Sequence, residues 1–251
     1  MDGFVDTALG RIHYVQKGKG RPLVLLHSNG ASCHEFHGCM DALAEKFRVL
    51  AWDMPGHGDS APIARHMTIS AYSDTLDQVL GELGIDSAIV GGSSVGAVIA
   101  ADFAARYSAR VEKVVLVELA VRPEQWWSDH WAMVEQMFSI PEQSAETIAA
   151  RLVRTPSERV VRRWNIDRHK AGGHTMMDVM WAGREYDVEP VLRSIRVSAL
   201  LVYGDKSPVS GPALQLKSEL DRGAIAIVTD AGHFPMLDAP DAFSSALLQF
   251  A

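Results

Sequence analysis

The chain has 251 residues, of which 47% are hydrophobic and 22% are charged. This balance is typical of a globular protein with a sizeable core, and the length fits one large domain or one domain with an insertion. A formal net charge of −7 without a basic cluster argues against nucleic-acid binding. No apolar run is long enough to span a membrane, and two cysteines six residues apart, Cys33 and Cys39, form no disulfide framework. We therefore expect a cytoplasmic protein without nucleic-acid or membrane partners.

The first half of the chain predicts a hairpin followed by alternating strands and helices. Residues 4–7 and 11–15 flank Leu9-Gly10 as a short hairpin, and residues 23–26 form the continuous apolar run of a buried parallel strand. The next predicted elements are a helix over 32–46, a strand over 47–52, a helix over 68–83, a strand over 88–90 that leads into a helix, and a strand over 113–119.

The alternation stops between residues 121 and 190, where the sequence is helical. Five of the six tryptophans and five of the ten methionines lie in this segment. It then resumes with a strand over 197–203, a helix over 212–220, a strand over 224–228 and a helix over 239–250. Alternating strands and helices predict an α/β fold with a mostly parallel sheet covered on both faces. We interpret 1–120 and 191–251 as the core and 121–190 as an inserted helical lid, whose apolar content would suit a homodimer.

Residues 92–96, Gly-Ser-Ser-Val-Gly, form the most informative motif. This G-x-S-x-G pattern follows an apolar run and opens a helix of small residues, which is the context of a nucleophile elbow. The turn holds Ser94 with its hydroxyl exposed, and the helix directs its N-terminal amides at developing negative charge. The motif therefore predicts Ser94 as a catalytic nucleophile.

A serine nucleophile needs a base within hydrogen-bond reach and a third group that orients the base. In this fold the base comes last in chain order, and His233 lies in the loop Asp230-Ala231-Gly232-His233-Phe234-Pro235, after the last predicted strand. We predict His233 as the general base.

These motifs together resemble the α/β-hydrolase superfamily over nearly the whole chain. The matching pieces are His27-Ser28-Asn29-Gly30, Asp53-Met54-Pro55-Gly56-His57-Gly58, the elbow and Gly232-His233-Phe234. The resemblance implies that the backbone amides of Asn29 and Val95 form the oxyanion hole. Ser28 departs from the glycine usual at its position.

The resemblance also leaves two carboxylates competing for the third triad position. Most relatives carry the acid after the seventh strand in a Gly-x-x-Asp turn, which here reads Gly204-Asp205-Lys206-Ser207 and ends in a serine. Asp205 is two residues early. Glu118 ends the preceding strand within an apolar run, where a charge is costly unless it is paired, and it would otherwise form an ion pair with an arginine such as Arg122. We favour Glu118 as the acid.

Some branches of the superfamily place the acid at this point. Haloalkane dehalogenases do so, but Ser94 stands where they carry the nucleophilic aspartate, which excludes dehalogenation. Lactonases similar to the zearalenone hydrolases match in the elbow, the Asp-Met-Pro-Gly loop, the glutamate and His-Phe-Pro. Their resemblance implies that Trp181 contacts the substrate, and we add Ser28, Met180 and Phe234 as predicted substrate contacts.

We expect neither a metal nor a cofactor. The segment Cys33-His34-x-x-His37-x-Cys39 contains metal-binding residue types, but on a helix Cys39 points away from Cys33 and His37. The favoured function is hydrolysis of a carboxylic ester or lactone with a bulky apolar body, a small molecule held under the lid. The alternatives are a carbon–carbon bond hydrolase in which Arg184 or Arg193 holds a substrate carboxylate, a perhydrolase side activity, and a ligand receptor with a vestigial triad.

Overall fold

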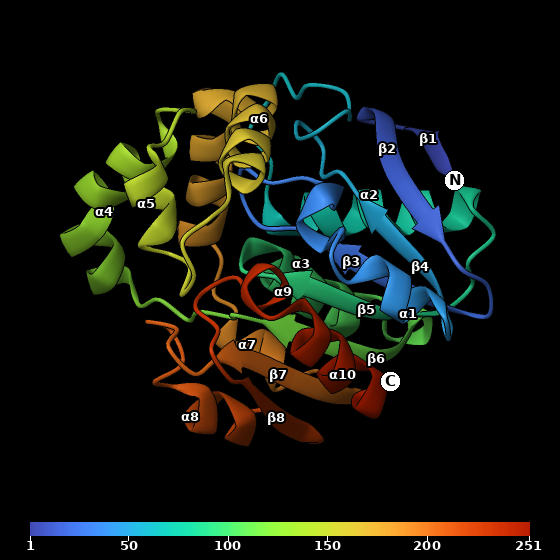
Figure 1. The fold of residues 1–251 in the computed structure, drawn as a ribbon. Helices are drawn as coiled ribbons and strands as arrows, with labels where there is room; N and C mark the ends of the chain where they lie inside the picture. Colours follow the sequence, from blue (N-terminus) through green and yellow to red (C-terminus); the bar gives the residue numbers. More distant parts are fainter.

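A computed structural model describes residues 1–251 and contains one eight-stranded sheet (Figure 1). The strands lie in the order β1-β2-β4-β3-β5-β6-β7-β8; β2 is antiparallel to β1 and β4, and all other pairs are parallel. The strands are β1 (Asp2–Thr7), β2 (Gly10–Lys17), β3 (Arg21–Leu26), β4 (Phe47–Trp52), β5 (Ala88–Ser93), β6 (Val111–Val117), β7 (Ser198–Gly204) and β8 (Gly223–Val228). The predicted α/β class and mostly parallel sheet are confirmed.

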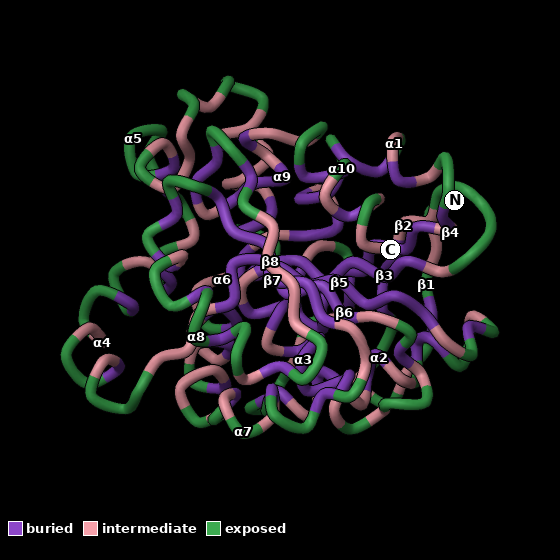
Figure 2. The backbone as a smooth tube through the Cα atoms, turned by 90° about the horizontal axis from the view of Figure 1, so that it is seen from below, coloured by how far each residue is buried: buried purple, intermediate pink, exposed green.

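Helices cover both faces of the sheet. Alternate residues of the central strands point to opposite faces, so Val24 and Leu26 pack in one core while Leu23 and Leu25 pack in the other. The first core is completed by α2 (Ile69–Glu82), α3 (Val95–Arg106), α7 (Glu189–Leu192) and α8 (Ala213–Ser218), and the second by η1 (Cys33–Phe36), α1 (Met40–Ala44), α9 (Pro235–Asp238) and α10 (Pro240–Phe250). Figure 2 shows the central strands as a buried layer between these helices. A short 3-10 turn, η2 (Ser108–Arg110), precedes β6.

One predicted helix is interrupted. The helix expected over 32–46 is instead the 3-10 turn η1 followed by the short helix α1, because the Cys33 amide donates to the Asp53 carboxylate and Ser32 caps the turn. The helix expected over 239–250 is confirmed as α10, which begins one residue later, at Pro240. Ala239 before it is not helical, as the residue before a proline tends to be (φ −140°, ψ 64°).

Three helices lie between β6 and β7, within the segment interpreted as a lid. They are α4 (Glu124–Phe138), α5 (Ala145–Ala149) and α6 (Glu158–Arg184), at the left and top of Figure 1. A small core joins α4 to α6 through residues that include Trp127, Phe138 and Met176. Gly172 breaks the long helix α6 with a positive φ of 74°, so its two halves meet at a kink. No helix of the structure combines the length and apolar character needed to cross a membrane.

Candidate active site

Ser94 occupies a strained turn between β5 and α3. Its φ of 55° and ψ of −113° lie outside the regions that L-residues favour. A side chain at Gly92 would place its Cβ 2.0 Å from the carbonyl oxygen of Gly96, and one at Gly96 would lie 2.3 Å from that of Leu26. Both positions therefore require glycine, and the packing brings the start of α3 against the end of β3. The elbow geometry leaves Ser94 partly exposed, although both flanking residues are buried.

The structure brings His233 and Glu118 together. Nδ1 of His233 lies 3.2 Å from Oε2 of Glu118, whose side chain is fully buried while that of His233 is 12% exposed. With the carboxylate ionised, Nδ1 carries the proton and Nε2 keeps its lone pair, as a general base requires. This contact joins residues 115 positions apart in the sequence.

The carboxylate of Glu118 is held by two further donors. Its Oε1 accepts the Gly204 amide at 2.7 Å, and its Oε2 accepts the hydroxyl of Ser207. Ser207 is the residue that stands where most relatives would carry the acid, and here it donates a hydrogen bond to the glutamate.

The two competing interpretations of this region do not match the geometry. Asp205 is exposed and accepts the Ala231 amide at 3.2 Å, and it makes no hydrogen bond or ion pair with His233. Arg122 does not pair with Glu118; its guanidinium stacks 4.2 Å from the ring centre of Trp126.

Backbone strain is concentrated at this site. The three non-glycine residues with a positive φ are Ser94, Glu118 and Asp230, at 54° to 55°. Such conformations cost about 1–3 kcal/mol each and persist where the surrounding structure enforces them. Two of these residues belong to the predicted triad, and the third lies three positions before His233.

Two backbone amides near the elbow have no partner. Val95 is the first residue of α3, so its amide has no carbonyl one turn earlier in the helix, and Asn29 follows β3 in a loop. Neither amide donates a hydrogen bond within the protein. The Asn29 side chain is already engaged, because its Nδ2 donates to the Met176 carbonyl at 2.9 Å. The two amides predicted to bind an oxyanion are therefore available to an external acceptor.

Known proteins share the fold that carries these residues. A family model described as the alpha/beta hydrolase fold matches residues 21–240. The chain belongs to this family. A pimeloyl-[acyl-carrier protein] methyl ester esterase from Nitrosospira multiformis is 26% identical over 95% of this chain and 97% of its own. An esterase from Exiguobacterium antarcticum superposes with a TM-score of 0.90 at 20% identity over 100% and 99% of the two chains. An enol-lactonase from Burkholderia xenovorans LB400 superposes with a TM-score of 0.83 at 23% identity over 99% of each chain.

The loop that carries the Asn29 amide in this α/β-hydrolase is fixed by a carboxylate that the sequence analysis missed. Both the amide and the hydroxyl of Ser28 donate to Oε2 of Glu35, at 3.1 and 2.5 Å. Glu35 is 5% exposed, and burial raises its pKa to about 7. The hydroxyl of Ser28, predicted to contact substrate, is thus held by Glu35. A lone acidic residue between Cys33 and Phe36 is the only signal that the sequence offers.

The other predicted substrate contacts, Trp181, Met180 and Phe234, differ in their burial and in their neighbours. Trp181 is 41% exposed, and its ring centre lies 4.3 Å from that of Trp131 on α4. Met180 packs against the small core between α4 and α6. Phe234 is 1% exposed and buried beneath Trp164, so it is not free to contact a substrate. The prediction for Phe234 is therefore wrong, because the turn after His233 directs this ring into the core.

A cavity of about 800 Å³ lies beside the loop that carries Asn29. Ser28 and Asn29 line it, together with η1 and the first half of α6, but Ser94 and His233 do not. Only six of its 21 lining residues are hydrophobic, and four arginines belong to them: Arg159, Arg162, Arg163 and Arg168. Most of the lining residues are therefore polar or charged in type, although the surface that they present to the cavity is mainly apolar.

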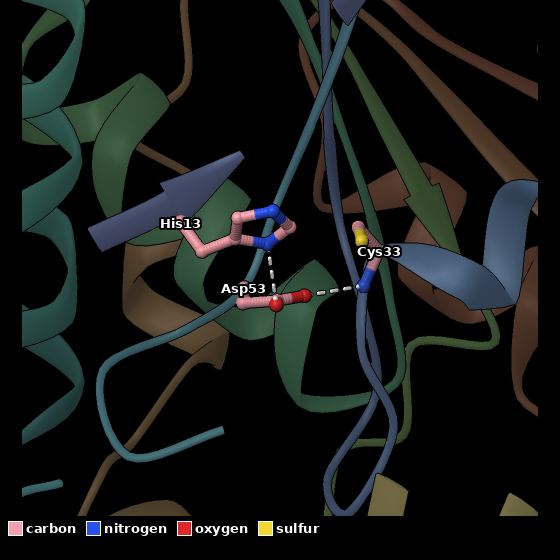
Figure 3. Close-up of side chains that lie close together, drawn as sticks. All are labelled: His13, Cys33 and Asp53. Atoms are coloured by element: carbon pink, nitrogen blue, oxygen red, sulfur yellow. Dashed lines mark hydrogen bonds and ion pairs between the residues drawn. The ribbon is translucent and has the colours of Figure 1, made fainter. Parts of the chain in front are cut away.

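The cysteines and histidines of residues 33–39 do not converge on one point. Cys39 lies against the Met236 carbonyl, and His34 bonds to Ser32. A different group, His13, Cys33 and Asp53, does come together (Figure 3). Its carboxylate accepts His13 Nδ1 at 2.8 Å and the amides of Cys33 and Asp59 at 2.7 and 2.8 Å, so its oxygens already have partners. Cys33 joins through its backbone nitrogen, as Figure 3 shows, and we interpret the group as structural.

This buried pair makes stability depend on pH. The hydrogen bond that His13 donates to Asp53 raises the pKa of His13 to about 9, against an ordinary value of 6.5. Burial opposes ionisation of Asp53, but the bond from His13 holds its pKa well below the usual range. The stabilisation from charged His13 is complete below pH 6.5 and is lost as the pH rises through about 9. The stabilisation from ionised Asp53 is lost only in acid, as the pH falls through the lowered pKa of this residue.

We therefore expect His13→Gln to reduce the free energy of unfolding by about 2–3 kcal/mol more at pH 6 than at pH 10, as measured by urea denaturation. His169→Gln, at an exposed position of α6, is the matched control and should show no such trend. If His13→Gln lowered the free energy of unfolding equally at both pH values, the result would contradict a stabilising His13–Asp53 ion pair.

Proposed function

We propose that this α/β-hydrolase cleaves carboxylic esters through an acyl-enzyme formed on Ser94, with His233 as the base and Glu118 as the acid. The observation that carries the proposal is the buried Glu118 carboxylate 3.2 Å from His233 Nδ1, on the sheet edge that also presents the elbow serine. The esterase from Nitrosospira multiformis, which aligns with 95% of the chain, supports ester hydrolysis over the other chemistries of this fold.

Acylation begins when Nε2 of His233 takes the proton of the Ser94 hydroxyl. The oxygen attacks the ester carbonyl, and the amides of Asn29 and Val95 stabilise the resulting oxyanion. Removing one such donor typically raises the barrier by about 3 kcal/mol. Glu118 holds the histidine ring in the required tautomer and stabilises the imidazolium, which then protonates the departing alcohol.

Deacylation repeats these steps with water. His233 deprotonates a water molecule that attacks the acyl-enzyme, and the collapse of the second oxyanion releases the acid and restores Ser94. The proton is returned to the serine, so the cycle needs neither a metal nor a redox cofactor.

A lactone is the second candidate substrate, because the acid lies after β6 as in the zearalenone-hydrolase-like lactonases that the sequence resembles. Two observations favour simple esters over an aromatic macrolactone. Trp181 packs at a tilted angle against Trp131 at an exposed position, and four arginines are among the residues that line the cavity beside Asn29. We therefore place the macrolactone second.

The remaining alternatives have less support. A carbon–carbon bond hydrolase was expected to hold a substrate carboxylate with Arg184 or Arg193. Arg193 is paired with Glu189 and Glu219, and Arg184 stacks on Trp131 and Trp181. A receptor with a vestigial triad would bind esters without turnover.

The test is hydrolysis by the purified protein of p-nitrophenyl butyrate, a methyl ester and zearalenone, with products identified by mass spectrometry. We expect turnover of the two simple esters. If the kcat/KM for ring opening of zearalenone exceeds the kcat/KM for both simple esters, a lactone is the preferred substrate. Binding of all three without turnover would overturn the proposal in favour of a receptor.

The pH profile provides a second test. Burial lowers the pKa of His233 below its ordinary value of 6.5, and the hydrogen bond that His233 donates to Glu118 opposes this shift only in part. His233 is therefore neutral at pH 7. We expect kcat/KM to be level from pH 7 to 8 and to fall about tenfold per pH unit below a midpoint under 6.5. A midpoint at pH 7 or above would contradict His233 as the buried base.

A further inference from the structure

Arg151 is a partly buried cation that forms no ion pair, although the negative charge of Glu35 acts on it through space. Its side chain makes no hydrogen bond and no ion pair; instead the guanidinium carbon lies 4.7 Å from the ring centre of Phe234 and 5.5 Å from that of Trp164. Burial lowers the pKa of Arg151 to about 10, so it stays charged at neutral pH. Withdrawing a charge from water without a partner costs free energy, which an anion from outside the chain would offset.

This cation lies beside the proposed catalytic base. The amide of His233 donates to the carbonyl of Arg151 at 3.2 Å, and Phe234, on which the guanidinium stacks, is the next residue. The positive charge of Arg151 also contributes, after burial, to the lowered pKa of His233. Arg151 is therefore within electrostatic reach of a substrate held at His233.

The neighbouring cavity adds further positively charged side chains. Trp164, the second ring under Arg151, lines the cavity of about 800 Å³ together with Asn29. The cavity arginines Arg159 and Arg162 form no ion pair, whereas Arg163 is paired with Asp167.

Two buried groups complete the wall of this cavity. Nη1 of Arg168 is buried without an acceptor in a side chain that is 1% exposed, so a further donor is left unsatisfied. Glu35 opposes the positive charge, but its Oε1 is also unpartnered and its pKa is raised to about 7 by burial. Glu158 and Asp167 are the other acids on the wall; Asp167 is paired with Arg163, which leaves three arginines against two acids without an ion pair.

We propose that Arg151 binds an ionised carboxylate of the substrate, so that the preferred substrates are monoesters of dicarboxylic acids. This inference rests on the proposed ester hydrolysis. The carboxylate would lie between Arg151 and the arginines of the cavity while the ester group, at the other end of the acyl chain, reaches Ser94. The apolar methylenes between the two groups would pass Trp164.

The experiment compares two methyl esters of equal chain length. One is the monomethyl ester of a dicarboxylic acid of six to eight carbons, and the other is the methyl ester of the corresponding monocarboxylic acid. Initial rates are measured for the wild type, Arg151→Gln and Arg151→Lys. Arg196→Gln is the matched control, because Arg196 is exposed between α7 and β7 and has no ion-pair partner. Thermal unfolding checks that each variant is folded.

We expect the wild type to prefer the charged ester. At pH 8, where His233 stays neutral, Arg151→Gln should lower kcat/KM for that ester at least tenfold more than kcat/KM for the neutral ester, mainly through KM. Arg151→Lys should recover part of the loss, and Arg196→Gln should behave as the wild type.

Equal losses on both esters would overturn the inference, since they would mean that Arg151 only holds Phe234 and Trp164 in place. Equal wild-type rates on both esters would overturn it as well and leave the proposed function standing. Failure of the wild type to cleave either ester would count against the proposed function itself.

Discussion

Ser94→Ala is expected to lower kcat/KM for ester hydrolysis by roughly 10⁵-fold or more, the scale seen when a triad nucleophile is removed. The reason is chemical, because alanine offers no oxygen to form the acyl-enzyme, and the oxyanion amides of Asn29 and Val95 act only on a tetrahedral intermediate. The measurement is the initial rate with p-nitrophenyl butyrate, with circular dichroism to show that the fold is retained.

Ser93→Ala is the matched control for this experiment. It removes the neighbouring hydroxyl, which is buried at the end of β5. We expect it to keep at least a tenth of the wild-type rate. A Ser94→Ala enzyme that retained more than a hundredth of the rate would mean that another residue is the nucleophile.

Glu118→Gln should cause the second largest loss, about 10⁴-fold in kcat. Glutamine keeps the size of the side chain, and its carbonyl can still accept the Gly204 amide. Its NH₂ group would face His233 Nδ1 as a donor, which favours the tautomer with the proton on Nε2. That tautomer cannot accept the serine proton. Steady-state kinetics on the folded variant measures this loss.

Two further variants distinguish Glu118 from Asp205 as the acid of the triad. Asp205→Asn should change kcat less than threefold, because its carboxylate accepts a backbone amide and does not contact His233. In Glu118→Ala, the added change Ser207→Asp would place a carboxylate where most relatives carry it. We expect this double variant to be at least tenfold faster than Glu118→Ala. A large loss of kcat in Asp205→Asn, together with a kcat near that of the wild type in Glu118→Gln, would mean that Asp205 and not Glu118 is the triad acid.

Local sequence signals were sufficient for most of the elements and for the local geometry at Ser94. The run 88–90 followed by Gly-Ser-Ser-Val-Gly predicted a strand, a tight turn and a helix, and the structure has β5, a strained Ser94 and α3 in this order. The position of His233 after the last strand followed from chain order. These features depend on residues that are close in sequence, which is why one sequence can reveal them.

Contacts between distant segments could not be predicted in the same way. The choice between Glu118 and Asp205 depended on which carboxylate reaches His233, a contact across 115 positions. The carboxylate of Asp53 binds the Cys33 amide at the start of the segment 32–46, and the periodicity of that segment did not indicate this contact. Phe234 is an aromatic residue of the kind that often lines ligand pockets. The turn after His233 nevertheless directs its ring into the core.

The most direct measurement is mass spectrometry of the protein after reaction with a fluorophosphonate, a probe that phosphonylates activated serines. We predict one adduct per chain on the peptide that contains Ser94, no adduct in Ser94→Ala, and slow labelling in Glu118→Gln. An adduct on a different residue, or hydrolysis of esters by a protein that is never labelled, would contradict the Ser94–His233–Glu118 triad.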